Sequence, residues 1–391
     1  IASRARHGGF VRGAELLDNA AFGVSPAEAA AMDPQQRLLL ERGYAALHAM
    51  NLDRAALGGS LTGVFLGIAQ TEFTQILADL PAGSSVYAAT GSALSIASGR
   101  LSYTLGLQGP CASYDTACSA ALTACHASLR ALQLNECVTS VVLGVNLMLT
   151  PRVGTSFAVA GMTSVRGRSH TFDARADGFV RGEACGAAAL SPDVDAPVGL
   201  LGSAVRQDGR SASLTAPNGL AQQGLLIAAL GDAGTVADEI TLIEAHGTGT
   251  ALGDPIEMGS LAAAVLASRS NSADALPIAG IKANIGHAEP AAGMTGLLKL
   301  AVGLEQREAA PNAQLRALNP HLGSSLQGAQ CVLPTQLCSL ATTGGGAGVS
   351  SFGYSGTIAH AVLQRGAGDT QVASIAPLEY RRRAFPWREA A

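Results

Sequence analysis

The chain has 391 residues, of which 48% are hydrophobic and 14% charged, and its formal net charge is −4. A chain of this length can bury a large core, which leaves room for two or three domains or for one large duplicated α/β unit. The weakly acidic charge excludes a global basic field, so we expect no nucleic-acid partner. No run of 18 apolar residues occurs and the opening IASRARHGGF is not a signal peptide, so we expect no membrane span.

In the first half of the chain, predicted helices alternate with predicted buried strands. Ser25-Pro26 and Asp33-Pro34 are typical helix starts, because a capping side chain precedes a proline that needs no N–H partner. The short apolar run GVFLGIAQ over 63–70 is typical of a buried strand. Further along, we expect helices over 92–107 and from about residue 118, and strands over 140–149 and 179–192.

Around residues 193–199 the alternation restarts. Strands that alternate with helices in both halves predict mostly parallel sheets with helices on their faces, and thus an α/β fold. We expect strands over 200–209, 240–250 and, as a pair, 346–364, and helices over 221–234, 257–268 and 290–306.

After about Gln364 the composition changes, and the rest of the chain is predicted to be a linker or tail. It contains Gly, Pro and a run of three arginines, Arg381–Arg383. For this run we favour a solvated surface over a docking segment.

The seven cysteines form no C-x-x-C pair and no zinc-type spacing with histidine, so no metal site is expected. An odd number of cysteines in a long chain is typical of a reducing compartment, and we expect a cytoplasmic or other intracellular location. Cys118 and Cys125 lie seven residues apart on one predicted helix, which Asp115 and Thr116 are expected to cap. A thiol at a helix N-terminus has a lowered pKa, so Cys118 is the candidate nucleophile; burial in the core is the alternative.

Gly-rich loops after predicted strands carry the other reactive side chains. In EAHGTGTALGDPIE, His246 precedes a loop whose N–H groups and two hydroxyls, from Thr248 and Thr250, suit a polar or phosphate-bearing arm. In GIKANIGHAEPAAG, Lys282 and His287 lie five residues apart. The turn in GVSSFGYSGTIAH can offer an N–H to an oxyanion. Together with a cysteine at a helix start, these groups indicate a catalytic site.

Other polar residues are expected to be structural. His126 and His360 lack comparable loops. Asp173, Asp177 and Glu183 lie in HTFDARADGFVRGEACG, which has no recognisable metal-ligand spacing.

Six stretches carry a family resemblance, in the order MDPQQRLLLE, GPCASYDTACSAAL, FDARADGFVRGEACG, EAHGTGTALGDPIE, IKANIGHAEPAAG and GVSSFGYSGTIAHAVL. Together they resemble the β-ketoacyl synthase (ketosynthase) domain of type I polyketide synthases, in the thiolase superfamily. The resemblance covers about residues 8–365.

The resemblance implies the thiolase fold, in which two similar α/β halves with mixed five-stranded sheets stack in a five-layer αβαβα arrangement and form a homodimer. The halves would span 1–195 and 196–365. Relatives have a strand before the point at which this sequence opens, so we expect the first half to lack its first strand. The tail over 366–391 resembles a linker that in relatives follows an acyltransferase and folds back on the ketosynthase.

The resemblance also implies the catalytic residues. Cys118 matches the nucleophile that accepts the acyl group. His246 and His287 match the two catalytic histidines, and Lys282 matches the lysine that orients the site.

Binding roles follow in the same way. Thr248 and Thr250 match residues that contact the phosphopantetheine arm. The backbone N–H groups of Cys118 and Tyr354 match the oxyanion hole, and Tyr354 also matches the gate of the acyl channel.

The implied reaction is the decarboxylative Claisen condensation of an acyl group on Cys118 with a malonyl-type extender on an acyl carrier protein, in polyketide or fatty acid synthesis. The implied enzyme is a β-ketoacyl-[acyl-carrier-protein] synthase, an acyltransferase that uses phosphopantetheine-linked substrates and no bound cofactor. No acyltransferase sequence lies between Gln364 and Tyr380. The expected partners are therefore an acyltransferase acting in trans or, if the chain is cut from a larger synthase, the other domains of that synthase.

Two other functions remain open. A non-condensing scaffold or acyl-transfer gatekeeper shares the fold, but inactive relatives typically lose the cysteine or the histidine of H-G-T-G-T. A degradative thiolase also shares it, but thiolases typically use a second cysteine. The presence of Cys118, His246 and His287 favours condensation.

The sequence departs from its relatives at three positions. Ile358 replaces an asparagine, which removes a polar group expected near the histidines. Ala283 replaces a serine, with a mild effect expected. Tyr354 is bulkier than the usual residue and bears on acyl preference.

Overall fold

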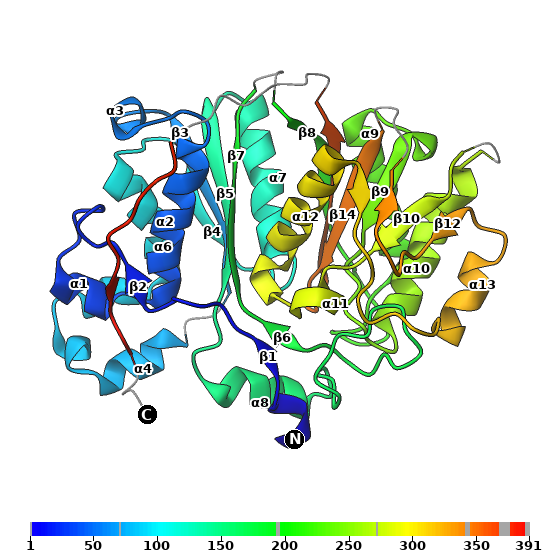
Figure 1. Ribbon diagram of the computed structural model, residues 1–391, viewed down its shortest axis with the longest axis horizontal. Coiled ribbons are helices and arrows are strands. Elements are labelled where there is room, and N and C mark those ends of the chain that lie inside the picture. Colours follow the sequence, from blue (N-terminus) through cyan, green and yellow to red (C-terminus); the bar gives the residue numbers. More distant parts are fainter. Residues whose placement is uncertain are drawn as a thin grey trace.

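Two β-sheets with helices on both faces form the framework of the computed structural model, which describes residues 2–69, 72–192, 196–270, 273–340, 345–366 and 376–387. Five layers follow one another across the molecule, as helices, sheet, helices, sheet and helices (Figure 1). Within the described residues, no helix has both the length and the apolar character needed to cross a bilayer.

The first sheet has the strand order β4-β3-β5-β7. Strand β3 (Thr62–Gly67) runs parallel to both β4 (Cys111–Tyr114) and β5 (Thr139–Asn146), and β5 runs antiparallel to β7 (Ala184–Leu190). All six residues of β3 are buried, since helices cover both faces of the sheet.

The second sheet repeats this arrangement in the order β12-β10-β9-β14-β15-β8. Its parallel strands β10 and β9 precede β14, which is parallel to β9 and antiparallel to β15. The bounds are β8 (Val198–Gln207), β9 (Ile240–Glu244), β10 (Leu276–Ala279), β12 (Cys331–Val332), β14 (Gly346–Phe352) and β15 (Thr357–Arg365).

Among the described residues the first sheet has four strands, one fewer than five, as expected for a half without its first strand, whereas the second has six and departs from the expected five. On the outer side of β15, β8 pairs antiparallel, whereas the equivalent edge of β7 has no strand partner among the described residues. The short β12 extends the second sheet at its other side.

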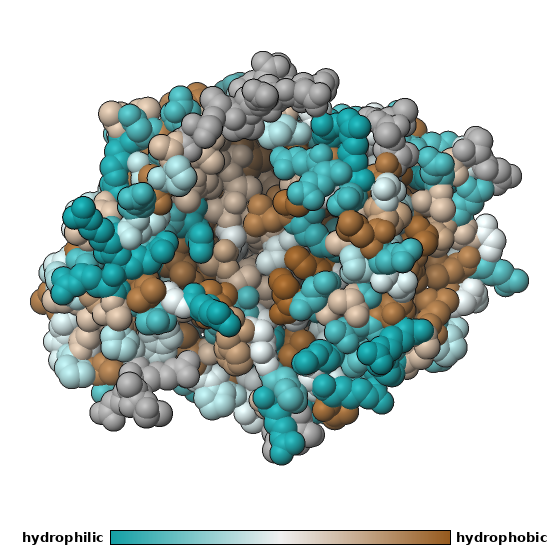
Figure 2. Space-filling view, viewed as in Figure 1, coloured by the Kyte–Doolittle hydropathy of each residue, from teal (hydrophilic) through white to brown (hydrophobic). Residues whose placement is uncertain are grey.

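The face of the molecule seen in Figure 2 has a hollow with apolar residues, over β7 and the central helices.

Each helical layer packs through its own hydrophobic cluster. Helices α2 (Pro34–His48) and α6 (Leu94–Leu105) cover the first sheet, and α9 (Gly219–Ala233) and α10 (Gly253–Ala264) cover the second. Between the sheets lie α7 (Ala120–Gln133) and α12 (Ala292–Gln306). The central layer approaches the first sheet closely because of glycine: a Cβ on Gly67 would lie 2.4 Å from the Ala121 nitrogen.

Both predicted helix starts are confirmed. Ser25 Oγ accepts a hydrogen bond from the Glu28 N–H at 3.1 Å, and Asp33 Oδ1 accepts one from the Gln35 N–H at 2.8 Å. The strand predicted over 179–192 is divided into two. The shorter elements are α1 (Pro26–Ala31), α3 (Arg54–Leu57), α4 (Phe73–Asp79), α5 (Ala88–Gly91), α8 (Pro151–Val159), α11 (Lys282–Ile285), α13 (Gly323–Leu326), β1 (Gly8–Gly9), β2 (Leu16–Leu17), β6 (Arg181–Gly182), β11 (Glu308–Ala309), β13 (Cys338–Ser339) and β16 (Arg383–Ala384).

The C-terminal segment docks on the first half, so the docking alternative holds for its backbone, whereas the prediction of a solvated surface holds for the three arginine side chains. Strand β16 pairs antiparallel with β2, and the red segment of Figure 1 runs along α2. Arg37, which is 1% exposed, donates to the Phe385 carbonyl at 2.6 Å, and Phe385 is itself buried. The side chains of Arg381–Arg383 are exposed, but their backbone is held in place by main-chain and side-chain contacts.

Candidate active site

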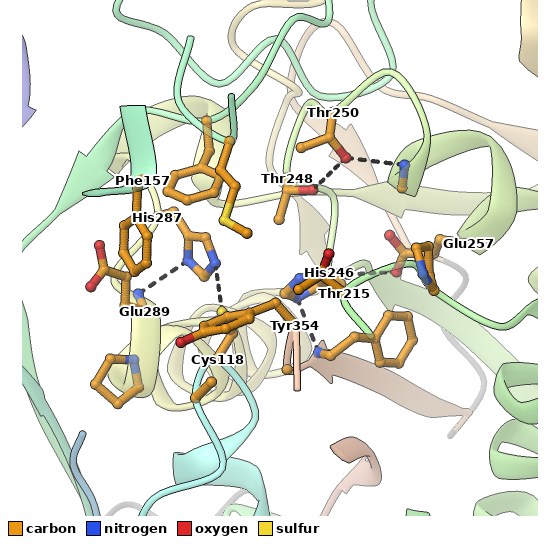
Figure 3. A pocket seen from close by; sticks show the side chains of 18 of the residues that line it. Cys118, Phe157, Thr215, His246, Thr248, Thr250, Glu257, His287, Glu289 and Tyr354 are labelled. Carbon is orange, nitrogen blue, oxygen red and sulfur yellow. Dashed lines mark hydrogen bonds between the residues drawn. The ribbon is translucent and has the colours of Figure 1, made fainter. Parts of the chain in front are cut away.

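A cavity of about 220 Å³ lies where the two halves meet, and both halves line it (Figure 3). The first half contributes Cys118 and Phe157, and the second contributes His246, His287 and Tyr354. Residues predicted from separate sequence motifs therefore come together in one pocket.

Cys118 lies in the turn between β4 and α7. The helix begins at Ala120 with Ser119 as its N-cap, so the predicted start at Cys118 is two residues early. The predicted cap is also wrong, because the Asp115 carboxylate accepts the Ala117 N–H at 3.1 Å instead. Ala117 has a φ of 53°, in the left-handed region, and this turn directs the chain from the strand into the helix.

The second half holds the backbone of this turn. Ser351 Oγ, on β14, donates to the Cys118 carbonyl at 2.7 Å. Gly353 passes so close that a Cβ there would lie 2.4 Å from the Thr116 carbonyl oxygen, so a side chain at this position would push the two loops apart. The nucleophile loop and the 353–354 turn are therefore fitted to each other.

His287 lies directly beside the thiol, with its Nε2 3.2 Å from Cys118 Sγ. Its other ring nitrogen, Nδ1, accepts a hydrogen bond from the Glu289 backbone N–H at 3.1 Å. In a neutral imidazole one nitrogen accepts while the other carries the hydrogen, so Nε2 of His287 is a donor that points at the sulfur.

His246 has the same arrangement. It follows β9, and its Nδ1 accepts the Phe352 backbone N–H at 3.2 Å, which leaves the hydrogen on Nε2. Glu257 fixes the backbone here by accepting the N–H groups of His246 and Gly247 at 2.6 and 2.8 Å. The ring centroids of His246 and His287 lie 5.6 Å apart, so both donors serve one space.

Burial keeps both histidines neutral. It lowers the pKa of His246 and of His287 well below the usual value, and the nearby positive charge of Lys282 lowers each further. Lys282 is 3% exposed, and burial lowers its own pKa while the carboxylates of Glu244 and Glu257 oppose that change. Lys282 thus lies within electrostatic reach of both rings.

The expected lowering of the Cys118 pKa is wrong. Burial raises the pKa of this thiol to about 12, with a further rise from the charge of Glu289. Lys282 and the backbone N–H groups of Tyr354 and Cys118 act in the opposite direction but do not outweigh burial. The resting group is therefore a thiol, with two N–H groups already directed at its sulfur.

Polar and apolar walls divide the pocket. Thr248 and Thr250 lie on one side, with their hydroxyl oxygens 3.2 Å apart, and Thr250 Oγ1 accepts the Gly253 N–H at 3.0 Å. On the other side Tyr354 meets Phe157 edge to face, with ring centroids 6.1 Å apart. Tyr354 is 44% exposed and thus stands at the rim of the cavity.

Several predicted structural residues lie outside the pocket. His360 is buried against Ser350, with Nδ1 2.9 Å from its Oγ, and His126 pairs with Ser203. Cys125 is buried in the cluster between the sheets. Asp173 accepts N–H groups from Arg175 and from the 316–317 backbone, as expected of a structural loop.

Some residues of the pocket were not predicted from the sequence to be functional. Phe157 and Met162 lie on or just after α8, a helix that was not predicted. Glu257 and Glu289 belong to motifs that were singled out, but no role was predicted for either. A carboxylate 11 residues after His246, in the first half of α10, was the available signal for Glu257.

Family models match nearly all of the first half and about two thirds of the second. Residues 2–196 match the N-terminal domain of β-ketoacyl synthases, and residues 199–316 match their C-terminal domain. A phenolphthiocerol/phthiocerol polyketide synthase protein of Mycobacterium tuberculosis is 40% identical over 368 residues, 92% of this chain and 24% of that protein. The spectinabilin polyketide synthase system protein NorC of Streptomyces orinoci is 40% identical over 92% of this chain and 16% of its own length.

Solved structures give the same result. The ketosynthase from module 6 of the bacillaene synthase of Bacillus subtilis 168 superposes with a TM-score of 0.85 at 33% identity, over 92% of this chain and 64% of that one. The oxazolomycin ketosynthase domain OzmH KS7 of Streptomyces albus JA3453 gives 0.86 at 32% identity, over 93% and 65%. The predicted family and the thiolase fold are confirmed. The chain spans about a quarter or less of the length of the Mycobacterium and Streptomyces orinoci relatives.

Proposed function

Because the chain belongs to the β-ketoacyl synthase family and is a ketosynthase domain, we propose that its pocket catalyses the decarboxylative condensation of an acyl group with a malonyl-type extender, with Cys118 as acyl acceptor. The observation that carries this proposal is the pair of imidazoles, His246 and His287, which both direct an Nε2–H into the space beside Cys118. A site for acyl transfer alone needs a nucleophile and an oxyanion hole, whereas two further neutral donors suit a second developing anion.

In the first half-reaction the acyl group moves from the carrier thioester to Cys118. The Cys118 sulfur forms a bond to the acyl carbon, the carbon–sulfur bond to phosphopantetheine breaks, and the proton of the Cys118 thiol ends on the released phosphopantetheine thiol. The backbone N–H groups of Cys118 and Tyr354, which contact the sulfur, support this proposal as donors to the oxygen of the tetrahedral intermediate.

In the second half-reaction the malonyl thioester loses CO2. The electrons of the broken carbon–carbon bond form an enolate, whose oxygen accepts from the Nε2–H of His246 and His287. The enolate carbon then attacks the acyl carbonyl, and Cys118 leaves as a thiolate that takes up a proton. Neutral histidines, with Lys282 close by to keep them neutral, remain donors throughout.

The substrates of this proposal are phosphopantetheine-linked, and the partner is an acyl carrier protein. The hydroxyls of Thr248 and Thr250 line the polar side of the cavity and suit the amides of the phosphopantetheine arm. The chain itself would hold no cofactor. We place it in an intracellular compartment, where its seven free cysteines remain reduced.

A homodimer is part of the proposal. Strand β4 is the edge of the first sheet, and an edge strand can pair with a second copy. Cys111 on β4 and Tyr103 on α6 are exposed, the latter by 88%, next to that edge. Sedimentation at micromolar concentration tests this, since Tyr103→Asp should shift the equilibrium toward monomer.

We also propose that the extender is loaded in trans, by an acyltransferase on another chain. The stretch between Gln364 and Tyr380 is too short for an acyltransferase domain, and Tyr380 stacks on Phe22 within the segment that docks on the first half. Incubation with malonyl-coenzyme A and a carrier protein should leave that carrier unloaded until an acyltransferase is added.

A non-condensing gatekeeper is the competing function, and one experiment distinguishes the two. The chain is incubated with an acyl and a malonyl carrier protein, and mass spectrometry detects acyl-Cys118 and the β-ketoacyl carrier. The proposal requires both species. Acyl-Cys118 without the β-ketoacyl product would show a gatekeeper, and a thiolase is disfavoured because Cys118 is the sole cysteine among the described residues that line the cavity.

A further inference from the structure

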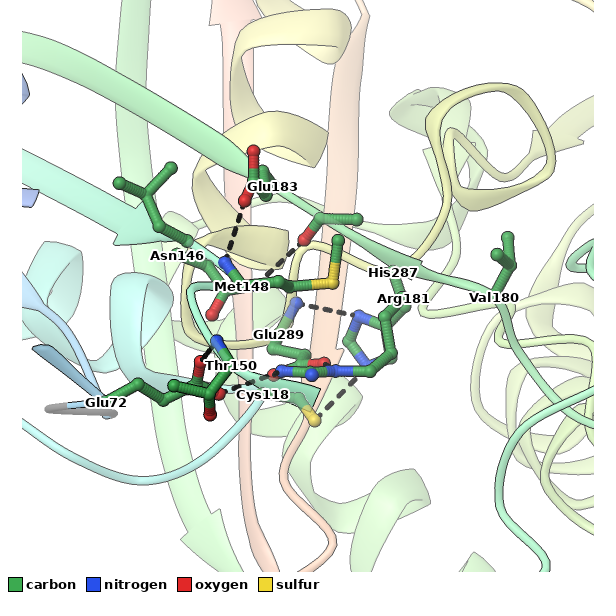
Figure 4. Close-up of polar contacts among 12 residues, drawn as sticks. Glu72, Cys118, Asn146, Met148, Thr150, Val180, Arg181, Glu183, His287 and Glu289 are labelled. Atoms are coloured by element: carbon green, nitrogen blue, oxygen red, sulfur yellow. Dashed lines mark hydrogen bonds and ion pairs between the residues drawn. The ribbon is translucent and has the colours of Figure 1, made fainter. Parts of the chain in front are cut away.

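Arg181 lies close to His287 but does not line the cavity (Figure 4). Its side chain contacts Glu289 and Phe157, which both line the cavity. It is 6% exposed and belongs to the short strand β6. Its guanidinium makes a two-point contact with Glu289: Nε donates to one carboxylate oxygen, and an Nη donates to the other at 3.0 Å.

Glu289 is the residue whose backbone N–H binds His287 Nδ1. Its φ is 49°, a left-handed conformation that a non-glycine residue rarely adopts unless its surroundings enforce it. The Arg181 side chain supplies that enforcement, because it grips the Glu289 carboxylate in a planar two-bond contact. Without the grip, the backbone is free to return to a negative φ and to turn its N–H away from the ring.

The backbone on either side of Arg181 holds the same histidine. The His287 N–H donates to the Val180 carbonyl at 2.7 Å, and the Gly182 N–H donates to the His287 carbonyl at 2.8 Å. The main chain around Arg181 therefore holds the backbone of His287, while the Arg181 side chain holds Glu289, whose N–H binds the His287 ring.

The guanidinium also reaches the apolar wall. Its central carbon lies 5.5 Å from the centroid of the Phe157 ring, within the range of a cation–π contact. Glu72, 4.0 Å from an Arg181 nitrogen, accepts the N–H groups of Leu149 and Thr150 at 2.8 and 2.6 Å, just before the helix α8 that carries Phe157. One side chain thus connects the histidine to the wall that faces Tyr354.

We propose that Arg181 is a positioning residue of the condensation site, which sets His287 as an Nε2–H donor through Glu289 and supports Phe157 in the acyl wall. This inference rests on the proposed condensation and concerns its second half-reaction. A misplaced donor is expected to cost about 10- to 100-fold in rate. Acyl transfer to Cys118 depends mainly on the backbone N–H groups and should change less.

The test measures loading and condensation separately in Arg181→Met and Arg181→Lys. Arg175→Met is the matched control, because Arg175 also makes a two-point contact with a buried carboxylate, that of Asp173. The Nε–Oδ1 and Nη–Oδ2 distances between these two residues are 2.6 and 3.0 Å. We expect Arg181→Met to lose about 10- to 100-fold in condensation. Arg175→Met should match the wild type in both half-reactions.

The deciding readout is the pH profile of CO2 release from the malonyl carrier. The titratable and charged groups around His287 are Cys118, His246, Lys282, Arg181 and Glu289. Removing the Arg181 charge, and leaving Glu289 uncompensated, makes His287 easier to protonate, so Arg181→Met should lose rate between pH 8 and 6 where the wild type is flat. Arg181→Lys keeps the charge and should stay flat at a reduced rate.

A low but flat profile for Arg181→Met would overturn the inference, since simple damage to packing lowers the rate equally at every pH. Equal losses in loading and condensation would overturn it as well. If Arg181→Met does not fold, Glu289→Gln takes its place, because it removes the carboxylate charge yet keeps the backbone N–H. Glu289→Gln should lose more rate in condensation than in loading, but its rate should not fall between pH 8 and 6. If the wild type and Arg175→Met do not condense, the proposed function fails instead.

Discussion

Cys118 and Cys125 lie seven residues apart, in the turn before α7 and within that helix, and their thiols are in the same acid–base state. Burial raises the pKa of each to about 12. What differs is the neighbourhood. Cys118 faces the cavity, with His287 Nε2 at 3.2 Å and backbone N–H groups at its sulfur. Cys125, which is 1% exposed, lies among side chains of the core.

Because the pKa of both thiols is raised alike, the proposed reactivity of Cys118 cannot rest on a resting thiolate. The turn at Ala117 places Cys118 where donors from the second half converge, and in the proposed reaction these donors act on the oxygen that becomes charged. Variants at the two cysteines and at the converging donors should therefore behave differently.

The largest effect is expected from Cys118→Ala, which removes the atom that accepts the acyl group. Loading should vanish, while Cys125→Ala should load at close to the wild-type rate. Intact-protein mass after incubation with an acyl carrier protein measures both. Persistent loading of Cys118→Ala would mean that the acyl acceptor is another residue.

The next largest effect concerns the donors that Cys125 lacks. His246→Ala or His287→Ala should slow condensation by about 10²–10³-fold, because each removes one donor to the enolate. Loading should fall much less. Quenched-flow measurement of each half-reaction tests this, and equal losses in both would show that the histidines serve only to hold the fold.

The pH dependence of alkylation sharpens the comparison further. Because the pKa of Cys118 is raised to about 12, the thiolate fraction should rise about tenfold per pH unit from pH 6 to 9, and alkylation with it. Cys125 should stay unmodified at every pH, since it is buried in the core. Peptide mapping after iodoacetamide treatment gives both rates, and a plateau near neutral pH would indicate a lowered Cys118 pKa.

A smaller change is expected at the rim. Tyr354→Ile keeps the backbone N–H but removes the ring that meets Phe157, so it should widen the cavity. Acceptance of longer or α-branched acyl groups should rise several-fold, with little change for the shortest. A panel of acyl carriers, scored as loading of Cys118, measures this. An unchanged profile would place the limit on chain length elsewhere in the channel.

The smallest effect separates packing from chemistry. Cys125→Ala deletes a buried sulfur from the cluster between the sheets and should cost about 1 kcal/mol of unfolding free energy. Cys118→Ala, which borders a cavity, should cost less. Urea unfolding of both variants tests this order, and the reverse order would show that Cys118 is the residue that the core requires.

Much of the fold could be predicted because the pattern of helices and buried strands is local. Strands such as β3 and β5 are apolar runs, and Ser25 and Asp33 cap helices in a readable way. Strands β4 and β10 were missed because CASY and LPIA are too short to show a period. The docking of Phe385 depends on Arg37, 348 residues away, which no local pattern reveals.

The site divides in the same way. His246 and His287 could be proposed because each lies in a Gly-rich loop, and Cys118 because it lies just before a helix. Arg181 and Glu289 could not, because their contact spans 108 residues and becomes visible only when the two halves meet. The direction of the Cys118 pKa was also missed, since burial depends on what packs over the helix start.

The most direct test of the account is a single turnover of isolated acyl-enzyme. The chain is loaded on Cys118, freed of carrier protein and mixed with malonyl carrier protein, and the intact masses of both proteins are followed. We predict that the acyl mass leaves Cys118 while the carrier gains the acyl group and loses CO2. An acyl group that stays on Cys118, or that reaches the carrier while the malonyl group keeps its carboxylate, would contradict condensation at this site.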